Sequence, residues 1–443
     1  MQKIKRYLLS ILISLPLIAC GQSCNNNVVK LNSTEVDVDI FEKAYEEVYK
    51  HYYDPAQLSH VKLFNAAIAE LGKELKSKSF EPKTIPAGVD YYAALKILIS
   101  ELDRAKALLS TTKEKNELSF TAVSAMLDSL DDSHTYFVIP ERYQEYKNRK
   151  TGKSTHSGVG VTLRRLEKDF YYFDSIFEGG PAAIAGLKRF DRLIAVDDKK
   201  ISDKFEEIVV MVRGPPGTTV KLTVLRNKEE LSFNVIRANV RAAAADYRII
   251  QDGEKSFGYF RIYGFEDTES YVKLLEFRDK FREAKVDALI IDVRSNPGGS
   301  IRSLNAFLDF FLPAGAETFQ EKGRGRSHMN GTFSGAQTDL PVVIIQNNDS
   351  GSASEVFAAV MQEQGRATVI GENSSGSVSA GIVRPLPYGA AMMVTVYQIF
   401  TAKGVKLEKV GVKPDIEAKL SKEAIESGKD TQLDEAIKKI GSR

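Results

Sequence analysis

The sequence predicts an α/β multidomain protein with a helical N-terminal part, a β-rich middle part and an α/β C-terminal part. Three observations carry this prediction. The chain has 443 residues, which is too many for one hydrophobic core. Apolar residues recur at helical spacing early in the chain, and short β-rich runs follow. Towards the C-terminus, apolar strands and a helix alternate, which is typical of a βαβ unit.

The bulk composition is that of an ordinary globular protein, with 43% hydrophobic and 27% charged residues. A net charge of +2 argues against nucleic acid as a partner, because nucleic-acid binders usually carry a clear basic excess. The 2 cysteines are too few for a disulfide scaffold or a thiolate zinc cluster. The 5 histidines are scattered and no clustered carboxylates accompany them, so we expect no metal and no cofactor.

Residues 1–19 predict a secretory signal peptide. Three basic residues precede an apolar stretch that is too short to span a bilayer. The stretch ends in Leu-Ile-Ala-Cys before Gly21, which resembles the bacterial lipobox and implies lipidation of Cys20. The alternative is an ordinary signal peptide that happens to contain a cysteine, and Cys24 would be a free thiol. We expect an exported chain anchored by lipid in the bacterial cell envelope, facing the periplasm or the cell surface.

Two segments follow this leader. Residues 20–38 are rich in Asn and Ser, as in a flexible tether. Residues 39–150 predict a helical domain that Pro82 and Pro86 divide into pieces. Its apolar residues fall on common helix faces at Phe41, Ala44, Tyr45 and Val48, and at Leu95, Leu98 and Leu102.

Residues 155–240 contain short runs of strand-forming residues separated by turns. The runs are Val159–Leu163, Tyr171–Ile176, Arg192–Val196 and Val220–Leu225. Their order resembles a PDZ domain, which implies that an extended peptide tail adds as a strand to a sheet edge. The resemblance places the terminal carboxylate on backbone amides of Gly158, Val159 and Gly160. Taken alone, this Gly-x-Gly is a weak signal, because most such pairs are simple turns.

Residues 241–420 predict an α/β core, and residues 421–443 a helical tail. Two continuous apolar runs, Asp287–Val293 and Pro341–Gln346, are typical of strands buried on both faces. A helix over Glu355–Gln364 and a strand over Ala367–Gly371 complete a βαβ unit.

Ser352 is a candidate nucleophile because it lies where a buried strand passes into a helix. The first backbone N–H groups of a helix have no internal partner, and the helix dipole favours negative charge there. A serine at such a turn has oxyanion donors beside it. The alternative is structural, because Ser352-x-x-Glu355 is also a capping box.

Three further segments carry chemistry only in combination. Two glycines, Gly298 and Gly299, follow the strand that ends near Asp292, and an N–H there would serve as a second oxyanion donor. His134 lies between the helical and PDZ-like parts, and histidine is the usual base near neutral pH. Glu408 stands in the segment Glu-Lys-Val-Gly-Val-Lys-Pro-Asp. Alone, these would be a tight turn, a surface or core histidine and an exposed carboxylate.

Together the segments resemble the C-terminal processing, or tail-specific, serine peptidases. The resemblance rests on Ser-Ala-Ser-Glu after one strand, Asn-Pro-Gly-Gly after an earlier one, a PDZ domain before both and Glu-x-x-Gly-Val-x-Pro-Asp near the end. It covers nearly the whole mature chain. It implies a crotonase- or ClpP-like α/β catalytic core with Ser352 as nucleophile, and an acyl-enzyme mechanism.

One departure from the family pattern changes the expected base. The commonest members use a Ser–Lys pair, with the lysine in a Thr-x-Gly-Lys-Gly turn, but Ser377 occupies that position here. The tricorn-core branch instead has a Ser-His pair before the PDZ domain and a glutamate in the last motif. This likeness implies that His134 is the general base and hydrogen-bonds Ser352, and that Glu408 orients it through Ser133. The oxyanion donors would be Ala353 and one of the two glycines.

The expected function is therefore a serine-type endopeptidase that cleaves exported proteins or peptides. The main alternative is a catalytically inactive ligand- or peptide-binding protein on the same fold, since a fold does not determine a function. A pure PDZ scaffold would leave the α/β part unexplained. The PDZ-like part would present a substrate tail, or keep base and nucleophile apart until a tail binds. The sequence leaves open whether the chain acts as a monomer or a homo-oligomer.

Overall fold

The computed structural model describes residues 33–150, 156–241, 243–265 and 269–442. The predicted signal peptide, Cys20 and Cys24 therefore lie outside the described residues. Helix α2 begins at Ser33, inside the segment predicted as a tether over residues 20–38, so that prediction was wrong over its last residues. In the described ranges, no helix has both the length and the apolar character needed to cross a membrane.

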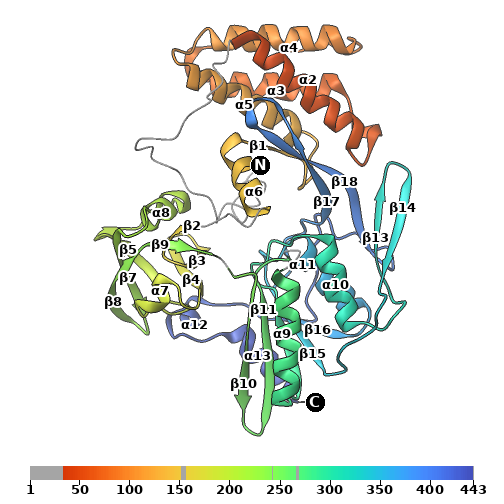
Figure 1. The fold of residues 1–443 in the computed structure, drawn as a ribbon. Helices are drawn as coiled ribbons and strands as arrows, with labels where there is room; N and C mark the ends of the chain where they lie inside the picture. The colour runs from red at the N-terminus through yellow and green to blue at the C-terminus, as the bar shows by residue number, and fades with distance from the viewer. Residues whose placement is uncertain (1–32, 151–155, 242, 266–268, 443) are drawn as a thin grey trace.

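The N-terminal part is helical, as expected; in Figure 1 α2 to α5 form the upper part of the molecule and α6 lies below them. Its elements are α2 (Ser33–His51), α3 (His60–Glu74), α4 (Tyr91–Lys106), α5 (Thr112–Asp128) and α6 (Pro140–Lys150). The residues that share a helix face in the sequence form one core, in which Phe41, Ala44, Leu98 and Leu102 are fully buried. Hydrophobic periodicity therefore identified this core correctly.

A sheet that we did not predict joins the helical part to the rest. It consists of β1 (Tyr136–Val138), β13 (Glu317–Gly323), β14 (Arg326–Gly331), β17 (Ser379–Pro385) and β18 (Ala391–Thr401). Strand β1 pairs antiparallel with β18, with Tyr136 opposite Met393. Met392 and Val394 pack into the core of the helical part. This pairing holds the segment just before Tyr136, which contains His134, against the C-terminal half of the chain.

The middle part is a β domain at the lower left of Figure 1. Its sheet has the order β3-β4-β5-β7-β8 (Val161–Glu167, Phe170–Ile176, Arg192–Val196, Thr219–Arg226 and Glu229–Ile236). Helices α7 (Pro181–Ile184) and α8 (Phe205–Val212) accompany it, and β2 (His156–Gly158) pairs with β9 (Ala238–Val240). The four predicted runs correspond to β3, β4, β5 and β7. Strand β8 was missed because mostly exposed residues make up its length.

The C-terminal part contains a six-stranded sheet in the order β10-β11-β12-β15-β16-β19. The strands are Ala245–Asp252, Lys255–Ile262, Ala288–Asp292, Val342–Gln346, Ala367–Gly371 and Ile416–Glu417, and all neighbours from β11 onward are parallel. Helices α9 (Glu269–Ala284), α10 (Ile301–Phe311) and α11 (Ala353–Glu363) cover one face, and α13 (Thr431–Gly441) covers the other. The strand, helix, strand prediction is met by β15, α11 and β16.

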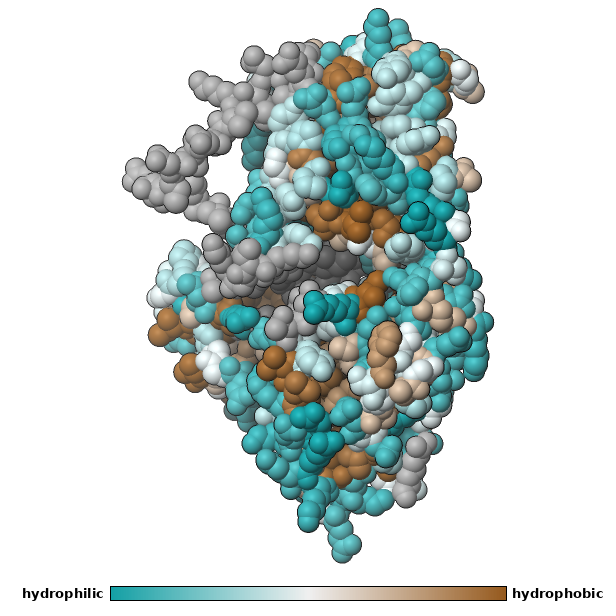
Figure 2. Space-filling view, turned by 45° about the vertical axis from the view of Figure 1, so that its right-hand side comes forward, coloured by the Kyte–Doolittle hydropathy of each residue, from teal (hydrophilic) through white to brown (hydrophobic). Residues whose placement is uncertain are grey.

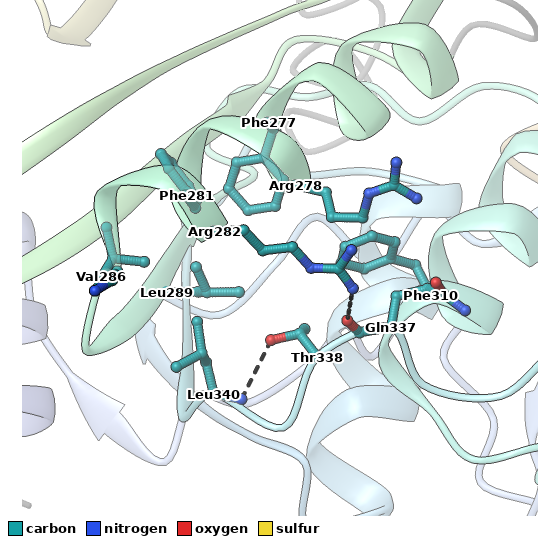
Figure 3. A pocket seen from close by; sticks show the side chains of 11 residues that line it. Phe277, Arg278, Phe281, Arg282, Val286, Leu289, Phe310, Gln337, Thr338 and Leu340 are labelled. Carbon is teal, nitrogen blue, oxygen red and sulfur yellow. Dashed lines mark hydrogen bonds between the residues drawn. The ribbon is translucent and has the colours of Figure 1, made fainter.

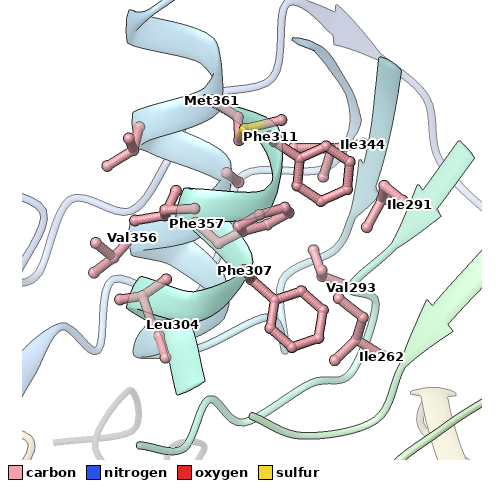
Figure 4. Packing of buried hydrophobic residues seen from close by; sticks show 14 of the residues in the cluster. Ile262, Ile291, Val293, Leu304, Phe307, Phe311, Ile344, Val356, Phe357 and Met361 are labelled. Atoms are coloured by element: carbon pink, nitrogen blue, oxygen red, sulfur yellow. The ribbon is translucent and has the colours of Figure 1, made fainter. Parts of the chain in front are cut away.

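The larger core of this part lies between the sheet and helices α10 and α11. Figure 4 shows Phe307 and Phe311 of α10 and Phe357 of α11 packed against the strand side chains of Ile291 and Ile344. Alternate residues of β12 face opposite sides, so that Ile291 enters this core and Ile290 enters the one under α13. Because this packing holds β12, β15 and α11 rigidly, the loops at the carboxyl ends of the two strands have a stable base.

Buried charges connect the β domain, the α/β sheet and the C-terminal tail. Arg294 follows β12 and contacts Asp292 at 2.5 Å and Asp430 at 2.7 Å. Asp430 also accepts from Arg189 of the β domain at 2.7 Å. Within the same network Asp174 of β4 pairs with Arg261 of β11 at 2.6 Å. Arg294, Asp292, Asp174 and Arg261 are almost completely removed from water, and Arg189 is partly buried, so these charges depend on their partners for compensation.

We expect Asp430→Asn to lower the free energy of unfolding by about 3–5 kcal/mol, because it leaves buried Arg294 and Arg189 short of a counter-charge. Urea denaturation measures the change, and Asp434→Asn, an exposed carboxylate on the same helix, is the matched control with an effect within about 0.5 kcal/mol. The arginines hold the pKa of Asp430 far below its usual range. Its contribution is therefore present above about pH 4, the unfolded value, and is lost as the pH falls towards the folded value. Equal stability of the two variants would contradict this account.

Candidate active site

Ser352 occupies a strained turn between a buried strand and a helix. Strand β15 ends at Gln346, α11 begins at Ala353, and Ser352 between them has φ 54° and ψ −121°. A non-glycine residue in this region costs of order 1–3 kcal/mol and persists only where the surroundings enforce it. Here Gly351 donates its N–H to the Asn296 carbonyl at 2.9 Å, which ties the turn to the loop after β12. The same kind of sharp strand-to-helix turn exposes the nucleophile in other hydrolases.

Glu355 enforces the geometry of this turn. Its buried carboxylate accepts the Ser352 N–H at 2.9 Å and the N–H groups of Gly376 and Ser377 at 2.7 and 2.9 Å. The hydroxyls of Ser374 and Ser375 donate to it at 2.6 and 2.9 Å. Burial raises the pKa of Glu355, and these hydrogen bonds oppose the rise. The Ser-x-x-Glu pattern predicted only a helix cap, whereas the carboxylate joins the serine turn to a loop twenty residues downstream.

Gly298 lies directly against the serine turn. It has φ +98°, and a Cβ placed on it would come within 2.6 Å of the Ser352 Cβ and 2.7 Å of the Ala353 nitrogen. Its own N–H is engaged, because it donates to the Asn296 side chain at 2.8 Å. Among the described residues, the N–H groups of Gly299 and Ala353 donate no hydrogen bond. Two N–H groups that donate no hydrogen bond, one in the glycine loop and one in the serine turn, therefore lie where these two segments meet, as an oxyanion site requires.

Ser133, His134 and Glu408 form one connected group. The Ser133 hydroxyl lies 2.7 Å from His134 Nδ1 and donates to Glu408 Oε2 at 3.1 Å. Glu408 is buried, and the same oxygen accepts the Val378 N–H at 2.7 Å and the Ser379 hydroxyl at 3.2 Å. The structure therefore brings together three of the predicted site residues. Ser133 and His134 are neighbours in the sequence, and Glu408 lies 275 positions after Ser133.

Ser352 adjoins this group through the backbone at the start of β17. Its N–H donates to the carbonyl of Ser377 at 2.9 Å, and the next N–H, that of Val378, binds Glu408. Ser377, which occupies the position of the lysine in the commonest family members, is therefore beside the nucleophile candidate. We expected a direct hydrogen bond between Ser352 and His134, and within the described residues none is formed. Catalytic hydrogen bonds often shorten only when substrate binds.

Burial lowers the pKa of His134, while the negative charges of Glu408 and Asp132 oppose this shift. The imidazole is therefore neutral at neutral pH, the state in which a histidine accepts a proton. Because Ser133 donates its proton to Glu408, its oxygen accepts one from His134 Nδ1–H. This hydrogen-bond pattern leaves Nε2 with the lone pair that a general base uses.

A cavity of about 310 Å³ lies between the β domain and the loops that follow β12 and β15. One end is lined by the predicted carboxylate-binding loop, Gly158, Val159 and Gly160, and the other by Pro297 and Asp349 next to the two active-site loops. Arg164 of β3 contacts Asp349 across this cavity. The space-filling view in Figure 2 shows the molecule hollowed across its middle, with hydrophobic residues along the rim of the recess. The predicted tail-binding loop therefore opens onto a cavity that reaches Pro297 and Asp349, in the loops after β12 and β15.

A second cavity, of about 250 Å³, lies at the opposite end of the sheet strands. Figure 3 shows its apolar floor of Phe277, Phe281 and Phe310, with Arg282 extending across it to the carbonyl of Gln337. It contains none of the candidate catalytic residues, so it has no part in the chemistry described here.

Comparison with known proteins places these features in a family. The profile of peptidase family S41 matches residues 256–418, and that of the PDZ domain matches residues 157–236. A carboxy-terminal-processing protease of Bartonella bacilliformis is 28% identical over 324 residues, covering 71% of this chain and 72% of its own. A carboxyl-terminal-processing protease of Picosynechococcus is 28% identical over 318 residues, covering 71% of this chain and 76% of its own. The solved structure of a photosystem II D1 C-terminal processing protease shares the fold, with a TM-score of 0.52 at 19% identity over 86% of this chain and 92% of its own.

A PDZ domain followed by this α/β core defines a serine peptidase of the C-terminal processing class. The chain contains a peptidase family S41 domain over residues 256–418, and its relatives are named carboxyl-terminal-processing proteases, which supports a serine peptidase hydrolase. The family and the fold class expected from the motifs are confirmed.

Two contributors to the site were not predicted. Asp132 precedes the Ser-His pair and accepts the His134 N–H at 2.9 Å, and Thr395 of β18 donates its hydroxyl to the same carboxylate at 2.5 Å. Asp132 belongs to the sequence Asp-Asp-Ser-His, but nothing in the local sequence distinguishes it from Asp131. Only the pairing of β1 with β18 shows which one faces inward.

Proposed function

We propose that the chain is an endopeptidase in which Ser352 attacks the scissile carbonyl and His134 is the general base. The observation that supports this most is the Ser133–His134–Glu408 group, placed beside a serine held in a strained strand-to-helix turn. The roles correspond to those of any Ser-His-carboxylate site, which is recognised by geometry and not by order in the chain.

The proposed reaction has two halves. The Ser352 oxygen forms a bond with the carbonyl carbon while His134 Nε2 takes its proton, and the oxyanion receives hydrogen bonds from the Ala353 and Gly299 N–H groups. The imidazolium then gives its proton to the leaving amine as the C–N bond breaks, leaving an ester on Ser352. Water, deprotonated by His134, releases the second product and restores the serine. Glu408 stabilises the imidazolium through Ser133.

We further propose that the PDZ domain binds the C-terminal tail of the substrate. Among the described residues, the N–H groups of Val159 and Gly160 donate no hydrogen bond, so a terminal carboxylate would satisfy them. Val159, Leu163, Val209 and Val212 line the same cavity and would surround an apolar last residue. The cavity extends to Pro297 and Asp349, in the loops that also lead to Gly298 and Ser352, which favours a tail that runs towards the site.

A single experiment tests both proposals. Unstructured fluorogenic peptides that end in an apolar residue are prepared with a free carboxylate and as the C-terminal amide. We expect cleavage of both, with kcat/KM about 10- to 100-fold higher for the free acid, because charge-assisted hydrogen bonds contribute about 1.5–3 kcal/mol. Both arms use the unaltered protein, so folding is not a variable. Cleavage of neither form would favour the binding-protein alternative, and equal cleavage would contradict tail recognition.

A further inference from the structure

Asp132 lies beside the base with one oxygen saturated and the other unpaired. Its Oδ1 accepts the backbone N–H of His134 at 2.9 Å and the Thr395 hydroxyl at 2.5 Å. Its Oδ2 is buried and lies within hydrogen-bond distance of no donor in the described part of the chain, although the Tyr52 phenol, itself buried without a close partner, interacts with this carboxylate. An unpaired buried carboxylate oxygen is costly, so it calls for an explanation.

Glu408, on the other side of the base, shows the same division. Its Oε2 accepts three hydrogen bonds, and its Oε1 is buried without a partner among the described residues. Both carboxylates act electrostatically on the imidazole, and both oppose the effect of burial on its pKa. His134 therefore lies in the field of two carboxylates, each of which is anchored by one oxygen and has no close hydrogen-bond partner at the other among the described residues.

The residues around Asp132 fix the position of its carboxylate. Thr395 is fully buried in β18, and it also receives support from Thr135, whose hydroxyl accepts the Thr395 N–H at 3.1 Å. Tyr52 of α2 faces Asp132: burial raises the pKa of its phenol, and the Asp132 charge adds to the rise. Lys409, which follows Glu408 in the chain, forms its ion pair with exposed Asp131 at 2.6 Å.

We propose that Asp132 is a positioning residue for the peptidase reaction, which anchors the His134 backbone through Oδ1 and supports the imidazolium with the unpaired charge of Oδ2. This inference rests on the proposed role of His134. Preorganised charge of this kind stabilises a transition state without reorganisation during the reaction. Asp132 acts together with Glu408, which reaches the ring through Ser133, while Asp132 reaches it through the backbone and through space.

The test compares Asp132→Asn with Asp131→Asn, which removes the same charge one residue away at a site that is 72% exposed. We expect Asp132→Asn to lower kcat/KM by about 100-fold at neutral pH with KM unchanged. We also expect it to move the acid limb of the kcat/KM profile to lower pH, because the imidazolium loses a stabilising charge. Asp131→Asn should leave both quantities as in the wild type, and Asp132→Glu should return the acid limb towards its original position.

A wild-type acid limb and rate in Asp132→Asn would overturn the proposal. Should this variant not fold, Thr395→Val decides, because it keeps the charge and removes the donor that holds Oδ1; a wild-type kcat/KM would then refute the positioning role. The Ser352→Ala variant, measured in parallel, distinguishes a failure of the proposed function from a failure of the inference about Asp132. Full turnover by Ser352→Ala contradicts the proposed function itself, whereas an inactive Ser352→Ala with an unaffected Asp132→Asn contradicts only the inference about Asp132.

Discussion

Replacing Ser352 by alanine is expected to lower kcat by about 10⁶-fold and to abolish covalent labelling by a serine-directed phosphonate. The change removes only the hydroxyl that forms the acyl-enzyme. The backbone of the turn, which is held by Glu355 and by the Ser377 carbonyl, keeps its hydrogen bonds. Turnover of a fluorogenic peptide and mass spectrometry of the labelled protein measure the two effects.

The control for this experiment is another serine of the same turn. Ser354 is fully buried and donates to the carbonyls of Asn296 and Gly351 at 2.8 and 2.7 Å, so it is not available for attack. The Ser354→Ala variant should therefore still be labelled, and the modified residue should map to Ser352. Labelling of Ser352→Ala at the wild-type level would show that the nucleophile lies elsewhere.

His134→Ala is expected to lower kcat by about 10⁴- to 10⁶-fold, because the serine then loses the base that accepts its proton. Residues that act as a unit are not additive, so the double variant with Ser352→Ala should be no slower than either single variant. In the wild type, kcat/KM should fall at low pH as the imidazole becomes protonated. Burial lowers the pKa of His134, so this limb should lie below the ordinary histidine value of about 6.5.

His328 provides the matched control for this variant, because it lies exposed on β14, away from the site. His328→Ala should retain wild-type kcat and pH dependence. If His134→Ala turned over at more than a tenth of the wild-type rate, the base would have to be another group, and the tetrad drawn from the Ser-His and Glu-x-x-Gly motifs would be refuted.

The local chemistry of the site was readable in the sequence. Strong hydrophobic patterns mark the elements next to the serine turn, the two glycines and the segment around Glu408. Strands β12, β15 and β16 begin and end within one residue of the predicted positions. The sequence left open which glycine N–H is an oxyanion donor, and the structure favours Gly299 because the Asn296 side chain occupies the N–H of Gly298. Nothing in the order of residues indicates which amide a side chain will occupy.

The position of His134 illustrates a different limit. Its segment reaches the core because β1, three residues long, pairs with β18 more than two hundred and fifty positions later. A strand of three partly buried residues has little periodicity of its own, so it is stabilised by its partner and not by propensity. The sheet that contains β13, β14, β17 and β18 was also not predicted, although its longest strand, Ala391–Thr401, is rich in strand-forming residues.

By itself the sequence determined the motifs, the family and the elements around Ser352, because turn chemistry and hydrophobic periodicity act over a few neighbouring residues. Only the tertiary structure decided that Ser133, His134 and Glu408 meet, that Glu355 joins two loops, and that Asp132 rather than Asp131 lies inside, bonded to His134 and Thr395. These facts depend on strand pairing and burial between distant segments, where many small contact energies add up to a single arrangement.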